Sequence, residues 1–152
     1  MPAPRTRRPR PGSPGRVITR LPDGHPANVY SAPCPSRAAL DRIADKWTAL
    51  LVGALATGTK RFGELRAEVD GISEKMLTQT LRSLERDGLV LRRAHPVVPP
   101  HVDYELTELG RTLERPLAAV RTWAERYINE VETARARHDG VAGSPEDDRS
   151  PG

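Results

Sequence analysis

The stretch GISEKMLTQTLRSLERDGLV, residues 71–90, decides the fold of this 152-residue chain. Its leucines recur at the spacing of one helix face, and they are Leu77, Leu81 and Leu84. The opposite side of that helix carries Lys75, Thr78, Gln79, Arg82 and Arg86. Ser73 is suited to cap the first turn, and Gly88 can take the left-handed conformation that ends a helix. The stretch predicts a helix with one face for a core and one for a polyanion.

A two-stranded ribbon is predicted directly after this helix. Residues 89–94 and 102–107 show the rough alternation of apolar and polar side chains typical of strands. They flank the tip HPVVPPH, residues 95–101, which its prolines stiffen. From this ribbon four basic side chains can reach a DNA backbone or minor groove, namely Arg92, Arg93, His95 and His101. Alternatively, the two arginines serve only as solvated strand residues.

The residues before the long helix complete a second pattern. RFGELRAEV, residues 61–69, predicts a short helix, and Asp70 and Gly71 form a turn into the longer one. A short helix, a tight turn and a longer helix form a helix-turn-helix, whose second helix enters the major groove. Upstream, residues 35–59 predict two scaffold helices that meet near Asp45. These helices, followed by the two-stranded ribbon, are typical of a winged helix-turn-helix.

A long C-terminal helix is predicted from Thr107, a suitable cap, to about residue 134. Its apolar residues follow a seven-residue repeat, which predicts a seam that packs on another helix. Pro116 predicts a kink or a fresh helix start. The seam is expected to form a homodimer interface through Leu113, Leu117, Val120, Trp123, Ala124, Tyr127, Ile128 and Val131. Packing within a single chain is the alternative.

The ends of the chain differ in composition from its middle. Residues 1–33 are rich in arginine and proline, and we expect a disordered basic arm that adds affinity for phosphates or is simply solvated. Residues 138–152 are expected to form a disordered tail. The folded part is then residues 34–137, mainly α-helical with a small β-ribbon.

Composition narrows the function. The net charge of +4 favours an anionic partner. Cys34 is the only cysteine, so no disulfide can form within the chain, and a cytoplasmic location is expected. No apolar run is long enough to span a membrane, so no membrane partner is expected. The histidines are scattered along the sequence, and no phosphate-binding loop is present, so neither an enzyme, a metal nor a cofactor is predicted.

Several short motifs occur together in one order. They are CP at residues 34–35, KW at 46–47, RFGEL at 61–65, GIS at 71–73, MLT at 76–78, GLV at 88–90, PPHVDY at 99–104 and LTELG at 106–110. Over about residues 34–131 this combination resembles the HxlR-type winged helix-turn-helix transcriptional regulators, relatives of the MarR group. The sequence departs from that pattern at residues 43–46, where a glycine-rich turn is more usual, and in its long N-terminal arm.

The resemblance implies a bacterial homodimer that binds double-stranded DNA and represses or activates nearby genes. Paired recognition helices about 34 Å apart would meet an inverted-repeat operator. Gln79 is suited to adenine and Arg82 to guanine. The full set of expected DNA contacts is Arg61, Ser73, Lys75, Met76, Thr78, Gln79, Arg82, Arg86, Arg92, Arg93, His95 and His101. The contrasting reading is a winged helix that binds protein or RNA without specific DNA binding.

Cys34 is the candidate sensor. It precedes Pro35 at the predicted start of the first helix, where the helix dipole favours a thiolate. Some HxlR-type regulators sense oxidants or electrophiles through an N-terminal cysteine, and the resemblance implies this role for Cys34. The alternative is a small buried residue that only packs. An oxidant or a small-molecule effector is therefore expected.

Overall fold

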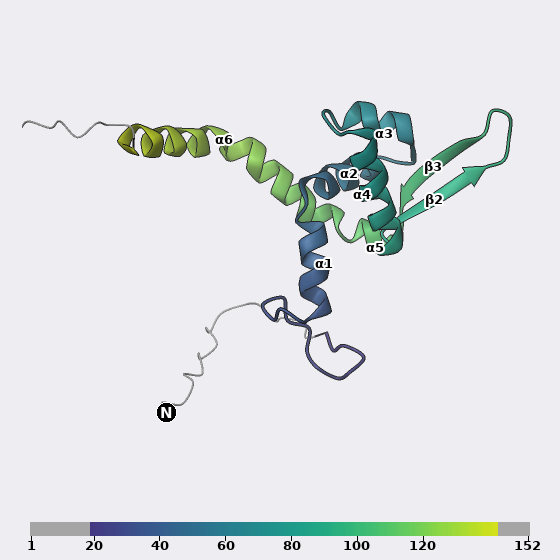
Figure 1. Cartoon of the computed structure of the whole chain (residues 1–152), viewed down its shortest axis with the longest axis horizontal. Helices are drawn as coiled ribbons and strands as arrows, with labels where there is room; N and C mark the ends of the chain where they lie inside the picture. Colours follow the sequence, from purple (N-terminus) through teal and green to yellow (C-terminus); the bar gives the residue numbers. More distant parts are fainter. Residues whose placement is uncertain (1–18, 143–152) are drawn as a thin grey trace, which may run out of the picture. The chain divides into compact units, whose positions relative to one another are not determined.

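The computed structural model describes residues 19–142, a mostly helical chain with one small antiparallel sheet (Figure 1). The elements in order are α1 (Pro35–Ile43), α2 (Lys46–Ala56), β1 (Lys60–Arg61), α3 (Phe62–Glu68), α4 (Glu74–Arg86), β2 (Val90–His95), β3 (His101–Leu106), α5 (Glu108–Arg111) and α6 (Glu114–Ala142). The chain divides into two compact units. The first ends at Ile43 and the second begins at Ala44. The predicted fold class, mainly helical with a β-ribbon, is confirmed.

Helix α4 begins and ends where its sequence predicts. Ser73 Oγ accepts a hydrogen bond from the Met76 backbone N–H at 3.0 Å. At the other end Gly88 has a φ of 74°. The Leu89 N–H donates to Leu84 O at 2.9 Å and the Gly88 N–H donates to Glu85 O at 3.0 Å. This pair of bonds is the Schellman ending, which only a residue tolerant of positive φ can complete cheaply.

The core of the second unit is built around α2, which packs against α3, α4, α6 and β3. The largest fully buried side chains are Leu51, Val52, Leu65, Leu77 and Leu81. The leucine face of α4 thus lies in this core, as its periodicity predicts. Because that face is buried, the polar face of the same helix must point to solvent.

The sheet contains one strand that sequence reasoning missed. Its order is β1-β3-β2, all antiparallel, with Arg61 paired to Asp103 on one side of β3 and Arg93 paired to Asp103 on the other. The sequence had predicted Arg61 within the short helix, which instead begins at Phe62. A two-residue strand is too short to leave an alternating pattern, so only the tertiary pairing reveals it.

The long C-terminal helix starts afresh at Glu114, with Pro116 in its first turn, where a missing N–H breaks no helical bond. Thr107 caps the separate four-residue helix α5, and its Oγ1 accepts from the Gly110 N–H at 3.0 Å. Arg121 fixes α6 to α2, because its Nη1 donates to Ala49 O at 2.8 Å. The two helices are therefore joined by a polar contact as well as by packing.

The predicted boundaries of the folded part need two corrections. Helix α6 continues to Ala142, whereas a tail was expected from residue 138; the alanine, arginine and glutamate residues before that point are strong helix formers. Residues 19–33, expected within a disordered arm, contain turns and an Arg20↔Pro26 bridge. Local side chains stabilise these turns, since Asp23 Oδ1 accepts from the His25 N–H. Predictions for residues 1–18 and 143–152 lie outside the described residues.

Among residues 19–142, no helix is both long and apolar enough to cross a membrane.

Candidate nucleic-acid interface

The solvent face of α4 presents a row of cationic and amide side chains. Lys75, Gln79, Arg82 and Arg86 are exposed, while Met76 and Thr78 are partly exposed. Within residues 19–142, the side chains of Lys75, Gln79 and Arg82 make no hydrogen bond or ion pair. These head groups can therefore bind an anion or a base edge without first breaking an internal contact.

Two other polar residues of this region are used by the fold. The oxygen of Ser73 already accepts the capping bond, so its O–H and one lone pair remain for other contacts. Thr80 is buried, and its Oγ1 donates to Met76 O at 2.8 Å. Ser73 therefore belongs to the helix cap and Thr80 to the core, and neither is part of the exposed row of α4.

The basic residues of the ribbon, which we call the wing (β2, β3 and the tip between them), are not equivalent. Arg92 is exposed and makes no ion pair within residues 19–142. Arg93 Nη2 lies 2.7 Å from Glu105 Oε1, and Arg61 Nε lies 3.9 Å from Asp103 Oδ1. Arg92 is therefore the freest cation of the wing, whereas Arg93 and Arg61 must leave an existing partner to reach a phosphate.

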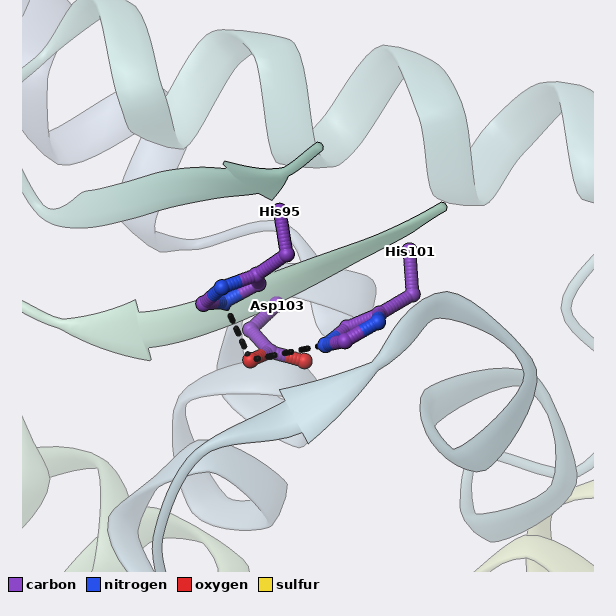
Figure 2. A group of neighbouring side chains, drawn as sticks. All are labelled: His95, His101 and Asp103. Atoms are coloured by element: carbon purple, nitrogen blue, oxygen red, sulfur yellow. Dashed lines mark ion pairs between the residues drawn. The ribbon is translucent and has the colours of Figure 1, made fainter. Parts of the chain in front are cut away.

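His95 and His101 both lie beside Asp103, and their contact with DNA stays a prediction. Their rings stack with centroids 4.5 Å apart, and both Nε2 atoms lie near Asp103 Oδ2, at 2.8 Å from His95 and 3.8 Å from His101 (Figure 2). The expectation that the histidines are scattered is wrong for this pair, because the hairpin register places His95 directly opposite His101. Asp103 was not singled out at all, although it lies two residues after His101 and so on the same face.

The seam of α6 divides between two environments. Leu117 is buried, at 7% exposure, and Leu113 is partly buried, so both belong to the core of their own unit and are not free for a partner. Farther along the helix, Val120, Trp123 and Ile128 are exposed by 59%, 56% and 48%. Tyr127 and Val131 are partly exposed and Ala124 is exposed. The second half of the predicted seam is thus an apolar stripe that is largely exposed in the described part of the chain.

Cys34 lies in the first unit, immediately before α1. Its Sγ accepts a hydrogen bond from the Asn28 backbone N–H at 3.4 Å and lies 3.0 Å from Ser36 Oγ. These two contacts, the Asn28 bond first, lower the pKa of the Cys34 thiol because they stabilise the thiolate. The side chain is nearly buried but lines a pocket of about 370 Å³ with Leu21, His25 and Asn28, so a small reagent has a route to the sulfur.

A second pocket, of about 420 Å³, lies within the second unit where α2 ends beside β3 and α5. Leu55, Leu106, Arg111 and Glu114 are among its lining residues. Its volume falls in the range of small-molecule sites, and it mixes apolar walls with charged groups. It is the candidate pocket for a noncovalent effector in the described part of the chain.

Comparisons with known proteins agree with this architecture. A model of the "HxlR-like helix-turn-helix" family matches residues 42–132. The Escherichia coli (strain K12) protein "Uncharacterized HTH-type transcriptional regulator YtfH" is 45% identical over 108 residues, which cover 71% of this chain and 86% of that protein. The structure of the "Putative transcriptional regulator ytfH from Salmonella typhimurium" is similar with a TM-score of 0.68 and 43% identity, over 72% of this chain and 98% of that chain.

Another similar structure is that of a protein described as a redox regulator. The "Redox regulator HypR in its oxidized form" matches with a TM-score of 0.57 and 44% identity, and the match covers 61% of this chain and 96% of that chain. The two YtfH proteins are named as transcriptional regulators and not as enzymes.

Proposed function

This chain belongs to the HxlR-like helix-turn-helix family and is a transcriptional regulator with a DNA-binding fold, and we propose that it acts as a homodimer on an inverted-repeat operator. The observation that carries the proposal is the outer face of α4, with Lys75, Gln79 and Arg82 exposed and unpaired within residues 19–142. Cationic and amide groups on one helix face are the donors that read base edges in a major groove.

The proposed DNA contacts fall into two groups, those to base edges and those to phosphates. Gln79 is matched to the adjacent donor and acceptor of adenine, and Arg82 to the two acceptors of guanine. Lys75, Arg86 and Arg92 supply positive charge to phosphates, which fixes register without reading sequence. Arg61 and Arg93 join them by exchanging a carboxylate for a phosphate. Both arginine side chains are more than half exposed, so solvent screens the ion pairs and the exchange costs little.

The pairing of two chains follows from the second half of α6. Its uncovered apolar stripe, centred on Trp123, is suited to bury against the same stripe of a second copy. A twofold axis there would set two α4 helices to meet successive major grooves about 34 Å apart on one face of the duplex. An operator made of two inverted half-sites is the expected target.

The first test is binding of the purified full chain to DNA from upstream of its own gene. Anisotropy titrations at several salt concentrations, with a scrambled duplex of equal length as competitor, separate specific from nonspecific affinity. We expect preferential, salt-dependent binding to the upstream duplex with two chains per site. Equal affinity for the scrambled duplex would instead favour a protein- or RNA-interaction module.

Replacement of Arg82 by alanine is expected to weaken binding to the operator by about 1–3 kcal/mol and to relax the preference at one base pair of each half-site. The reason is that only base-edge contacts carry sequence information. A panel of single-base operator variants measures the preference. Arg135→Ala, at an exposed arginine near the end of α6, is the matched control and should leave binding unchanged. A uniform loss across the panel would make Arg82 a phosphate contact.

We further propose that Cys34 makes the regulator responsive to oxidants or electrophiles. The support is the lowered pKa of the thiol, its place on a pocket wall, and the similarity to a redox regulator. Peroxide oxidises the thiolate to a sulfenic acid and is itself reduced to water. Because the chain has no second cysteine, that acid condenses with a thiol of a second chain or of a small molecule, and the products are a disulfide and water.

Diamide joins two thiols directly as a disulfide and is itself reduced to a hydrazine. It is expected to weaken operator binding by wild type by about tenfold, within the usual range of coupling between two sites, and to leave Cys34→Ser unaffected. Intact mass and a nonreducing gel identify the product. An equal loss of binding in Cys34→Ser would contradict the sensing role and direct attention to the pocket beside Arg111.

The reactivity of Cys34 is expected to persist to lower pH than that of a cysteine in an unfolded peptide. A lowered pKa means that the thiolate forms earlier as pH rises, so the rate of alkylation by iodoacetamide should reach half its maximum at lower pH than for the peptide. Ser36→Ala removes one of the hydrogen bonds and should move this midpoint upward. An unchanged midpoint in Ser36→Ala would contradict the assigned role of the hydroxyl.

A further inference from the structure

We propose that His95, His101 and Asp103 bind a divalent transition-metal ion, of the zinc class, at the base of the wing tip. The backbone brings the three together: His95 and His101 form the last cross-strand pair before the tip, and Asp103 follows on the same face of β3. All three side chains are partly buried, which holds them against the ribbon and leaves one side accessible.

The ligand atoms are already close. One nitrogen from each imidazole and one carboxylate oxygen all lie within 4.8 Å of one another (Figure 2). A zinc ion with bonds of about 2.0–2.1 Å holds neighbouring ligands in a tetrahedral site about 3.3 Å apart. Because all three residues already project from one face of the ribbon, rotation of their side chains can bring the ligand atoms to that spacing without movement of the strands.

The chemistry of the ligands selects the ion. Two imidazoles and one carboxylate suit Zn²⁺, Co²⁺ or Ni²⁺ better than Mg²⁺ or Ca²⁺, which prefer oxygen ligands. The negative charge of Asp103 offsets part of the charge of the ion. Three protein ligands also leave a fourth position open to water or an outside donor.

An unsatisfied atom marks the same place. His95 Nε2 is buried and makes no hydrogen bond within residues 19–142, although Asp103 Oδ2 is 2.8 Å away. No aligned hydrogen bond has to be broken for this nitrogen to bind an ion. A metal ion between the two groups would bind both His95 and Asp103.

The charged residues around the site predict how a substitution changes its affinity for the metal. Arg61 Nε lies 3.9 Å from the other oxygen of Asp103, so its positive charge competes with the ion. Arg93, opposite Asp103 in the register, is instead engaged by Glu105 at 2.7 Å. Replacement of Arg61 by glutamine should therefore tighten binding of the metal, whereas loss of any ligand should weaken it.

The test uses the full chain without an affinity tag. Co²⁺ is titrated first, because the visible absorption of its bound form reports geometry, and Zn²⁺ is then measured by competition. We expect one ion per chain and at least about tenfold weaker affinity in His95→Ala, His101→Ala and Asp103→Asn. At one Zn²⁺ concentration well above the wild-type Kd, the melting temperature should rise more for wild type than for Asp103→Asn.

Three variants serve as controls. His25→Ala and His138→Ala alter exposed histidines outside the ribbon, and Cys34→Ser removes the only thiol. All three should bind Co²⁺ like wild type. Circular dichroism confirms that each ligand variant is folded. A wild type without stoichiometric binding, or binding that is lost in any control, would overturn the proposal. Since no DNA is present, the result is independent of the operator proposal.

Discussion

Replacement of Gly110 by alanine is expected to destabilise the chain by about 3 kcal/mol, seen as a fall in melting temperature of about 10 °C. A Cβ at this position would lie 2.0 Å from Leu89 O and 3.0 Å from Leu89 C. Both are backbone atoms of the residue just before β2, so no side-chain rotation relieves the collision. Gly110 is thus required for close approach, and its φ is not positive.

The region around Gly110 cannot shift freely, because several bonds join the same two segments. The Thr107 N–H donates to Leu89 O at 3.0 Å, and the Thr107 hydroxyl donates to Gly88 O. Thr107 also caps α5. Movement of α5 away from Leu89 would therefore break the contacts that join the end of α4, the wing and the C-terminal helices.

Gly63→Ala is the matched control for this prediction. Gly63 lies within α3, and a Cβ there would meet nothing within 4 Å. Alanine favours the helix over glycine by about 0.8–1.0 kcal/mol, so this variant should be slightly more stable than wild type. Thermal and urea unfolding followed by circular dichroism measure both variants. Equal stability of Gly110→Ala and wild type would contradict the close approach to Leu89.

Local signals predicted α4 well. Ser73 and Gly88 mark its ends within the sequence itself, and the leucine spacing identifies its buried face. A helix of this length contains several turns, so the spacing of its apolar residues can be recognised without knowledge of the tertiary fold. The same holds for the break before α6, which Pro116 indicates.

Contacts between distant residues were much harder to predict. Arg121 donates to Ala49 across 72 positions, and Gly110 packs on Leu89, yet neither pair has a local pattern. The histidine pair depends on the exact register of the hairpin, and a shift of one residue would have turned His95 to the other face. The seven-residue repeat predicted the apolar positions of α6 as a single dimer seam, but periodicity could not tell that Leu117 would be buried by its own chain while Trp123 stays exposed.

Replacement of Trp123 by glutamate is expected to dissociate the proposed homodimer and to lower affinity for the operator by about 100-fold or more. Trp123 is 56% exposed in the single chain, and its ring lies 5.7 Å from that of Tyr127, so the two form the centre of the uncovered stripe. A charge buried there without a partner is costly. Two linked binding units gain about 10²–10⁴-fold in affinity over one, and a monomer loses this gain.

Thr122→Glu separates loss of pairing from other effects of an added charge. Thr122 is exposed on the same helix, but helical spacing places it opposite the stripe. We expect this variant to remain a dimer with wild-type affinity. Because Trp123 is exposed and outside the core of its unit, Trp123→Glu should keep the melting transition of a folded chain, although at lower temperature if pairing adds stability.

Light scattering after size exclusion measures the mass of each variant, and anisotropy with full and half operators measures DNA binding. For Trp123→Glu we expect the mass of one chain and similar, weak affinity for both duplexes, because a single recognition helix reads one half-site. Wild type should prefer the full operator. A dimeric Trp123→Glu with unchanged affinity would show that the exposed half of α6 is not the pairing surface. A different surface would then have to join the two chains that bind the two half-sites.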